Sequence, residues 1–112
     1  MELALVVAII RSLALEDAEK RLQEIGVRGI TVTKVKGYGE HANFFTRDWM
    51  TDEVKIEVFA ARDKVERIAA AILDAAHTGS PGDGIVAILP VDQVFSARTR
   101  AEAIPNWVRE IG

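Results

Sequence analysis

Hydrophobic positions along the chain recur with two periods, one typical of strands and one typical of helices. Residues 3–10 ("LALVVAII") and 84–91 ("GIVAILPV") are nearly continuous apolar runs, which predicts strands with apolar side chains on both faces. Residues 12–26 and 61–79 repeat apolar positions at helical spacing, and Gly26 stands where the first helix would end. These patterns predict two buried strands and two amphipathic helices.

Two more strands are predicted in the middle of the chain, at residues 29–39 and 54–60. Residues 40–53 have no clear period and are expected to form a loop, and residues 92–98 are a candidate for a short final strand. The order strand–helix–strand, repeated once, predicts an α+β, ferredoxin-like βαββαβ fold: a four-stranded antiparallel sheet with two helices on one face. We expect residues 1–112 to form a single domain.

The two apolar strands pose a packing problem. Two helices cover only one face of such a sheet, whereas residues 3–10 and 84–91 send apolar side chains to both faces. An uncovered second face would expose a larger apolar patch than monomers normally carry. We therefore expect a homo-oligomer whose copies cover this face. The alternative is that the final strand and the C-terminal residues fold back over it.

Composition and charge exclude several classes of function. The formal net charge is −3, which argues against nucleic acid as the main partner. The chain has no cysteine, so a disulfide or a zinc–cysteine site is excluded. The N-terminal apolar run is too short to span a bilayer and lacks the basic flank of a signal peptide. We expect a cytoplasmic protein that is not inserted in a membrane.

The sequence has no catalytic or metal-binding pattern. Its two histidines, His41 and His77, do not belong to a motif with metal-ligand spacing, and no serine has a His–Asp relay near it in sequence. We therefore expect neither an enzyme activity nor a bound metal.

The most distinctive stretch is "HTGSPGDG", residues 77–84, which we call the glycine loop. Its glycines would allow backbone N–H groups to converge on an anion. The alternative is a helix C-cap at Gly79 followed by a turn at Pro81–Gly82. Spacing alone leaves both open, although the absence of a following lysine excludes a Walker P-loop.

Several motifs, in order along the chain, resemble the P-II signal-transduction protein family. They are "GITVTKVKGYG", "VKIEV", "AAHTGSPGDGIVAIL" and "SARTRAEA", and the resemblance spans residues 3 to about 102. It implies a trimeric, ferredoxin-like protein that binds adenine nucleotides in clefts between subunits. It also implies signalling by a T-loop that docks onto transporters or enzymes.

The resemblance assigns segments and contacts to this chain. Residues 40–53 correspond to the T-loop, 77–84 to the phosphate-facing B-loop and 98–112 to the C-terminal loop and tail. The implied nucleotide-binding residues are Gly29, Thr31, Gly37, Gly39, Glu57, Gly82, Asp83, Gly84 and Arg98. Alternative interpretations are an ordinary strand residue for Thr31 and a solvated charge for Glu57. Because a carboxylate repels phosphate, we expect Asp83 to cap local amides or orient the loop.

Four positions depart from the family's pattern. Ile85 and Glu53 stand where the family usually has lysines, and Ser96 replaces an arginine. His41 occupies the position of a glutamine that, in the family, helps to hold magnesium and 2-oxoglutarate. Each charge-assisted phosphate contact contributes about 1.5–3 kcal/mol, so these losses weaken triphosphate binding most. We expect ADP or AMP to be favoured over ATP.

The T-loop-like segment has only fourteen residues and contains Phe44, Phe45 and Trp49. Aromatic side chains on a polar surface are typical partner anchors, here for a membrane transporter or an enzyme. The alternative is that the rings pack onto the base of their own loop. Residues 104–112 extend past the family's usual core, and would either pack on their own oligomer or form a lid over the nucleotide cleft.

The sequence therefore predicts a regulatory signalling protein that binds an adenine nucleotide between the subunits of a homotrimer. The nucleotide would control a transporter or enzyme through the short T-loop. The alternative is a nucleotide-independent oligomeric module that senses bicarbonate or a metal and is associated with a transport system.

Overall fold

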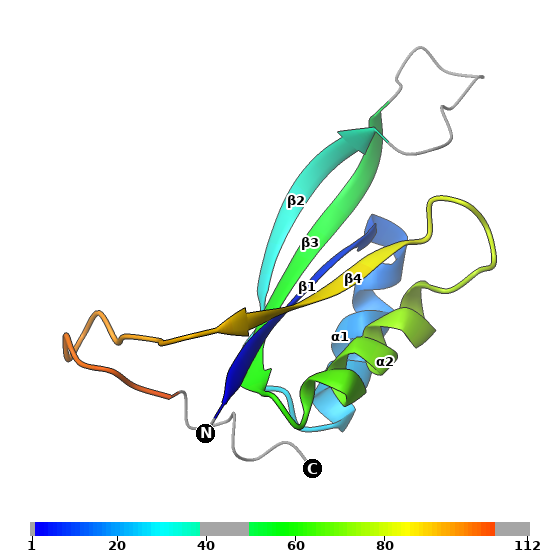
Figure 1. Ribbon diagram of the computed structural model, residues 1–112. Coiled ribbons are helices and arrows are strands. Elements are labelled where there is room, and N and C mark those ends of the chain that lie inside the picture. Colours follow the sequence, from blue (N-terminus) through cyan, green and yellow to red (C-terminus); the bar gives the residue numbers. More distant parts are fainter. Residues whose placement is uncertain (1, 39–49, 105–112) are drawn as a thin grey trace.

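A single antiparallel sheet with two helices on one face forms the body of the protein (Figure 1). The computed structural model describes residues 2–38 and 50–104. The elements in chain order are β1 (Leu3–Arg11), the 3₁₀ helix η1 (Ser12–Ala14), α1 (Leu15–Glu24), β2 (Thr31–Tyr38), β3 (Met50–Ala61), α2 (Val65–Ala76) and β4 (Gly84–Val91). The strand order is β2-β3-β1-β4, which confirms the predicted ferredoxin-like fold.

Strand β1 lies inside the sheet and pairs with β3 on one side and with β4 on the other. Val6 is opposite Val58 of β3 and Ile88 of β4, and the pairing with β3 continues to Arg11 opposite Glu53. Strands β2 and β4 form the two edges. The only proline of the described strands, Pro90, lies on the edge strand β4, which is where a sheet tolerates a residue without an N–H.

The core lies between the sheet and the helices. Successive strand side chains point to opposite faces, so the even-numbered residues from Ala4 to Ile10 of β1 and from Val54 to Ala60 of β3 face the helices and are buried. The fully buried side chains include Val6, Ile10, Leu22, Val54, Ile56, Val58, Val65, Ile68 and Ile72. Fully burying a branched apolar side chain contributes about 1.5–3 kcal/mol, which makes this layer the main source of stability.

The structure shifts several predicted boundaries. Strand β3 begins at Met50, although residues 50–53 were expected to belong to the loop, because they pair with residues 35–38 of β2. Helix α2 begins only at Val65, because Ala61 still pairs with Leu3 in the sheet. The polar residues Thr51, Asp52 and Glu53 at the start of β3 interrupt the alternation of apolar and polar positions by which a strand is predicted from sequence.

The chain leaves each helix in a different way. Gly26 follows α1 with φ of 93°, as the sequence predicts for a residue just past a helix end. Helix α2 instead ends with His77 as an extended C-cap, whose N–H donates to the Leu73 carbonyl at 2.9 Å. A C-cap at Gly79 is therefore wrong, because this glycine lies two residues beyond the cap.

No final strand forms in residues 92–98. This part of the chain makes an isolated bridge between Phe95 and Glu102, and the Ala103 N–H donates to the Val94 carbonyl. Residues 92–104 form an arm that projects from the end of β4 (Figure 1). The arm pairs with itself through these contacts, and Val94 and Ile104 pack against Leu3 and Ala61 of the sheet.

The sheet face opposite the helices remains open in the described chain. Leu5, Val7 and Ile9 of β1 are half-buried there, and the exposed fraction is 64% for Ile85 and 43% for Leu89 of β4. The alternative cover by the C-terminal residues fails for the described arm, because it projects away over most of its length. The expected cover by other copies of the chain stays a prediction.

We predict that replacing Leu89 with lysine lowers the mass of the protein in solution. Light scattering at micromolar concentration should give a multiple of the 12.3 kDa protomer for the native sequence and a smaller mass for Leu89→Lys. The charge would have to be buried at the interface, whereas Leu13→Lys, at a leucine that is 97% exposed on η1, should leave the mass unchanged. A native protein that runs as a single protomer would contradict the prediction.

Candidate functional site

The glycine loop connects the end of α2 to the start of β4. Because Gly84 pairs with Ile10, the loop lies beside the last residues of β1, on the opposite side of β1 from Glu53 of β3 (Figure 1). The antiparallel sheet thus brings the loop to the C-terminal end of β1, and Arg11 is the first residue past that pairing.

Asp83 organises the interior of the loop. Its carboxylate accepts hydrogen bonds from the N–H groups of Thr78 at 2.7 Å and Gly79 at 2.9 Å, and from the Thr78 hydroxyl. The Asp83 N–H donates to the Ser80 carbonyl at 3.3 Å. The expectation that Asp83 caps local amides is confirmed, and the N–H groups of Thr78 and Gly79 point to this carboxylate.

These bonds stabilise the ionised form of Asp83. The hydrogen bonds from the Thr78 hydroxyl and N–H, with smaller effects from the Gly79 N–H and the Arg11 guanidinium, lower the pKa of the Asp83 carboxyl to about 2. Partial burial of the group opposes this shift. The loop is therefore held around a fixed negative charge at neutral pH.

Arg11 holds the outer side of the loop. Its Nε donates to the Gly82 carbonyl at 3.0 Å and its terminal nitrogen donates to the Pro81 carbonyl at 2.8 Å. The same terminal nitrogen lies 3.8 Å from the Asp83 carboxylate. Arg11 is a site residue that the sequence reasoning missed. Its signal was its position directly after the apolar strand that must pair beside the loop.

Two glycines are required by this geometry. Gly84 has φ of 121°, and a Cβ there would lie 2.2 Å from the Ile9 carbonyl oxygen. Gly82 has φ of 92°, and a Cβ there would lie 3.0 Å from the Arg11 terminal nitrogen. The positive φ at both positions, together with the close approach of Gly84 to the backbone of β1, therefore explains both glycines without a ligand.

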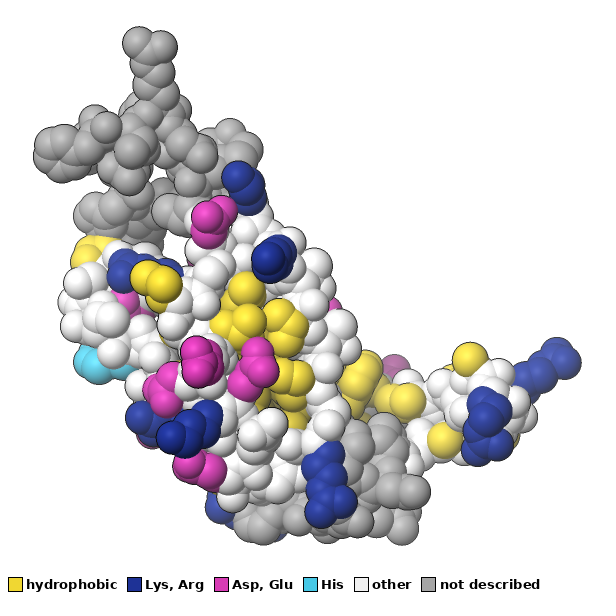
Figure 2. Space-filling view, turned by 180° about the vertical axis from the view of Figure 1, so that it is seen from behind, with side chains coloured by type: hydrophobic (Ala, Val, Ile, Leu, Met, Phe, Trp, Pro, Cys, Tyr) yellow, Lys and Arg dark blue, Asp and Glu magenta, His cyan; other side chains and the backbone are white. Residues whose placement is uncertain are grey.

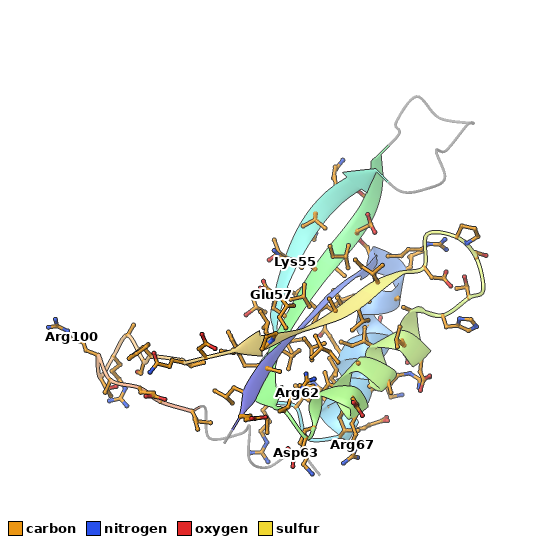
Figure 3. The ribbon with its side chains drawn as sticks, in the orientation of Figure 1. Lys55, Glu57, Arg62, Asp63, Arg67 and Arg100 are labelled. Atoms are coloured by element: carbon orange, nitrogen blue, oxygen red, sulfur yellow. The ribbon has the colours of Figure 1, made fainter. Side chains whose placement is uncertain are left out.

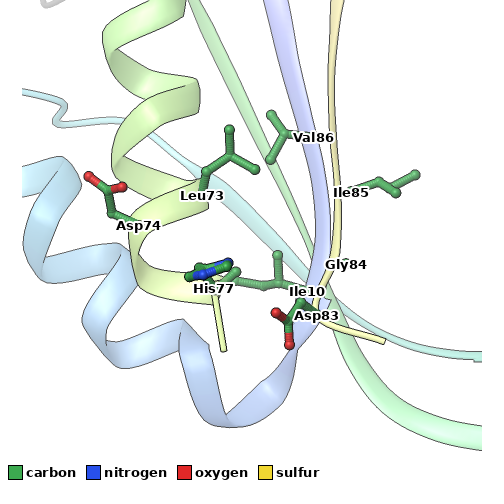
Figure 4. A pocket seen from close by; sticks show the side chains of 9 residues that line it. Ile10, Leu73, Asp74, His77, Asp83, Gly84, Ile85 and Val86 are labelled. Carbon is green, nitrogen blue, oxygen red and sulfur yellow. The ribbon is translucent and has the colours of Figure 1, made fainter. Parts of the chain in front are cut away.

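A pocket of about 350 Å³ opens between the end of α2 and the start of β4 (Figure 4). Its walls include Leu73 and His77 from α2, and Ile85 and Val86 from β4. Asp83 and Asp74 are the acidic residues at its rim. The described wall has no lysine or arginine, because Ile85 occupies the position after the loop.

The remaining predicted residues fall into separate places. Thr31 and Glu57 are cross-strand partners on the open face, and Lys55 lies 3.9 Å from the Glu57 carboxylate. Figure 3 labels this pair on β3. Gly37 lies near the end of β2, opposite Thr51, and Gly29 precedes that strand.

Arg98 lies in the projecting arm, separated from the glycine loop by the whole of β4. Eight strand residues span about 26 Å, so Arg98 cannot reach Gly82 within the same chain. Figure 3 shows the neighbouring Arg100 at the outer end of the arm, and Figure 2 shows this arm from behind with basic side chains at its tip.

Several predicted residues lie outside the described part of the chain. They are Gly39 of the nucleotide set and the aromatic residues Phe44, Phe45 and Trp49. Within residues 2–38 and 50–104, no three His, Asp or Glu side chains come together as a metal site. No helix in those ranges is both long and apolar enough to cross a membrane.

The four-stranded antiparallel sheet with both helices on one face defines an α+β protein of the ferredoxin-like class. The family model "Nitrogen regulatory protein P-II" matches residues 3–101. The chain therefore belongs to the P-II family of regulatory signalling proteins.

Known proteins and structures agree with this assignment. The chain is 40% identical to "Nitrogen regulatory protein P-II" of Azospirillum brasilense, over 82% of this chain and 88% of the relative. It is 40% identical to "Nitrogen regulatory protein GlnK2" of Haloferax mediterranei, over 85% of this chain and 83% of the relative. A crystal structure of Arabidopsis thaliana PII bound to citrate superposes with a TM-score of 0.76 at 33% identity, covering 91% of this chain and 89% of that one.

We predict that Asp83→Asn destabilises the protein in a pH-dependent way. The pKa of Asp83 falls from 3.8 to about 2 on folding, so its stabilising effect is complete only above about pH 5 and is lost as the pH falls through 2. Urea denaturation of both proteins between pH 6 and pH 2 should show a difference in unfolding free energy that closes over this window. A difference that does not change with pH would contradict the assigned role of the carboxylate.

We predict unequal effects of alanine at two glycines of the same loop. Both have positive φ, but a Cβ at Gly79 meets no atom within 4 Å, whereas one at Gly84 meets the backbone of β1. Gly79→Ala should cost about 1–2 kcal/mol in unfolding free energy from backbone strain alone. Gly84→Ala should cost about 2–6 kcal/mol, because strain and overpacking add. Equal losses in thermal or urea denaturation would show that the close approach to β1 is not decisive.

Proposed function

We propose that this P-II protein is a regulatory signalling protein that binds an adenine nucleotide between subunits. The observation that carries the proposal is the separation of its candidate residues within one chain. Gly82, Asp83 and Gly84 lie at one end of β4, whereas Arg98 lies beyond the other end. A second copy could supply Arg98, with Thr31 and Glu57, to the glycine loop of the first.

The open sheet face supports this assembly. Leu5, Val7 and Ile9, together with the exposed Leu89, give a continuous apolar surface whose burial against other copies would be favourable. A homotrimer closed around these faces would place the glycine loop of one subunit near the arm of another. Nucleotide binding would then depend on assembly.

The charges around the loop favour a nucleotide with few phosphates. Arg11 donates to the carbonyls of Pro81 and Gly82, and Asp83 lies 3.8 Å from it, so much of its charge is already compensated. Ile85 supplies no cation at the next position. A triphosphate needs more neutralisation than this site provides, so we infer that ADP or AMP is favoured over ATP.

The short T-loop-like segment, residues 40–53, would transmit the signal to the partner protein. A nucleotide at the C-terminal end of β2, near Gly37 and Gly39, would bind one arrangement of this segment better than another. That difference in affinity limits how far the nucleotide can shift the segment. Phe44, Phe45 and Trp49 would then contact a membrane transporter or an enzyme as buried anchors.

Calorimetry with AMP, ADP and ATP, each with and without bicarbonate, tests the proposal. We expect saturable heat with AMP or ADP and weaker binding of ATP. Leu89→Lys, which should disrupt assembly, should abolish the heat because the site would lose the residues of the second subunit. Heat from none of the three nucleotides would contradict the proposal.

We predict that Ile85→Lys reverses the nucleotide preference. One added charge-assisted contact to phosphate is worth about 1.5–3 kcal/mol, or roughly 10–150-fold in affinity, and ATP should gain more than AMP. Glu66→Lys, on the first turn of α2, raises the charge of the protein far from the loop and should leave the ratio of the ATP and AMP affinities unchanged. An unchanged ratio in Ile85→Lys would contradict a phosphate site at the glycine loop.

A second candidate is a nucleotide-independent oligomeric module that binds bicarbonate or a metal beside a transport system. The observation that favours it is the internal bonding of the loop, since the N–H groups of Thr78 and Gly79 already donate to Asp83. The same calorimetry distinguishes the two, because this candidate gives heat with bicarbonate or a divalent metal in the absence of nucleotide.

A further inference from the structure

The projecting arm returns to the body of the protein at its last described residue. Ile104, like Val91 and Val94, packs against the buried apolar pair Leu3 and Ala61, and these five residues form a small cluster. Leu3 and Ala61 are cross-strand partners, and so are Leu3 and Val91, so the cluster lies where β1 begins and where β3 and β4 end. This is the end of the sheet opposite to the glycine loop.

A pocket of about 470 Å³ adjoins this cluster. Leu3 and Val91 belong both to the cluster and to the pocket wall. The rest of the wall comes from Glu2, Arg62, Ile88, Pro90 and Asp92. The wall of the pocket thus combines apolar side chains with acidic and basic groups, and it shares Leu3 with the cluster against which Ile104 packs.

The sequence continues from this point with "PNWVREIG", residues 105–112. Pro105 favours an extended backbone at Ile104, and three more residues reach about 10 Å, which brings Trp107 within range of the adjoining pocket. An indole ring suits a site that is lined by both apolar and charged side chains, because it buries a large surface and donates one hydrogen bond. Glu2 and Asp92 offer acceptors for that bond, and they complement the positive charge of Arg109.

We propose that residues 105–112 bind in this pocket of their own chain, with Trp107 as the anchor. The segment would fasten the returning arm to the ends of β1 and β4. It would act at the far end of the sheet from the glycine loop, and so would not form a lid over the loop of its own subunit. The segment lies beyond residues 3–101, the part of the chain that the family model matches.

Cysteine cross-linking tests this position directly, because the native chain has no cysteine. The test pair is Asp92→Cys with Val108→Cys, and the matched control pair is Ser80→Cys with Val108→Cys. A disulfide requires Cα atoms within about 7 Å, so only the true neighbour is bridged under mild oxidation. We expect a bridge within one chain for the Asp92 pair and none for the Ser80 pair, seen as mobility on a non-reducing gel.

Every other pattern overturns the proposal. A disulfide in the control protein with Ser80→Cys and Val108→Cys would place the segment over the glycine loop. A bridge from Asp92→Cys that joins two chains would show that a second copy fills the pocket. No bridge in either pair, in protein that keeps the native circular dichroism, would show that the segment binds at neither place.

Fluorescence gives an independent measurement. In a Trp49→Phe background, Trp107 is the only tryptophan. Its emission should be blue-shifted and protected from acrylamide, and Pro90→Phe should shift it to the red by filling the pocket. Leu73→Phe, in the pocket beside the glycine loop, is the matched control and should leave the emission unchanged. A solvent-exposed emission in the Trp49→Phe protein, or equal shifts from both phenylalanines, would overturn the proposal.

Discussion

The double pairing of β1 is the constraint on which the rest of the structure depends. Because β1 lies between β3 and β4, its even-numbered side chains are buried against the helices and its odd-numbered side chains line the open face. The same pairing places Gly84 against the backbone of Ile9 and Ile10, with no room for a Cβ. The start of β4, and with it the glycine loop, is therefore fixed relative to Arg11 by sterics and by backbone hydrogen bonds. The two ends of β1 therefore have different neighbours. The glycine loop lies beside the C-terminal end, and the apolar cluster against which Ile104 packs lies at the N-terminal end.

The glycine loop is held from both sides by opposite charges. Asp83 binds the N–H groups on the inside, and Arg11 binds the carbonyls of Pro81 and Gly82 on the outside. Each backbone dipole meets a charge of the sign that stabilises it, so the loop keeps its shape without a ligand. A preformed loop of this kind loses little conformational entropy on binding. It also offers little unbalanced positive charge, which is the physical basis for the proposed preference for ADP or AMP over ATP.

The sequence predicted the parts of the fold that depend on local pattern. Strand β4 begins and ends where its apolar run does, and the capping role of Asp83 follows from the repulsion between a carboxylate and a phosphate. Strand β3 was predicted too short, because Asp52 and Glu53 break its apolar alternation although they pair with Lys36 and Val35 of β2. Arg11 was missed for a related reason. Its contacts are with residues about 70 positions away, and no local pattern reports a contact that exists only after the sheet has formed.

The division of the candidate site has a consequence for regulation. If the glycine loop of one subunit and the arm of another enclose one ligand, the ligand stabilises the assembly as well as the loop. By linkage, anything that repositions the arm then changes ligand affinity by the same free energy with which the ligand changes the arm. The packing of Ile104 against the cluster of Leu3 and Ala61 ties the arm to the start of β1, and β1 ends at Arg11, which holds the loop. Within one subunit, β1 thus connects the arm and the glycine loop through rigid paired backbone. In the proposed assembly these two segments belong to two different sites, so β1 would couple one site to the next.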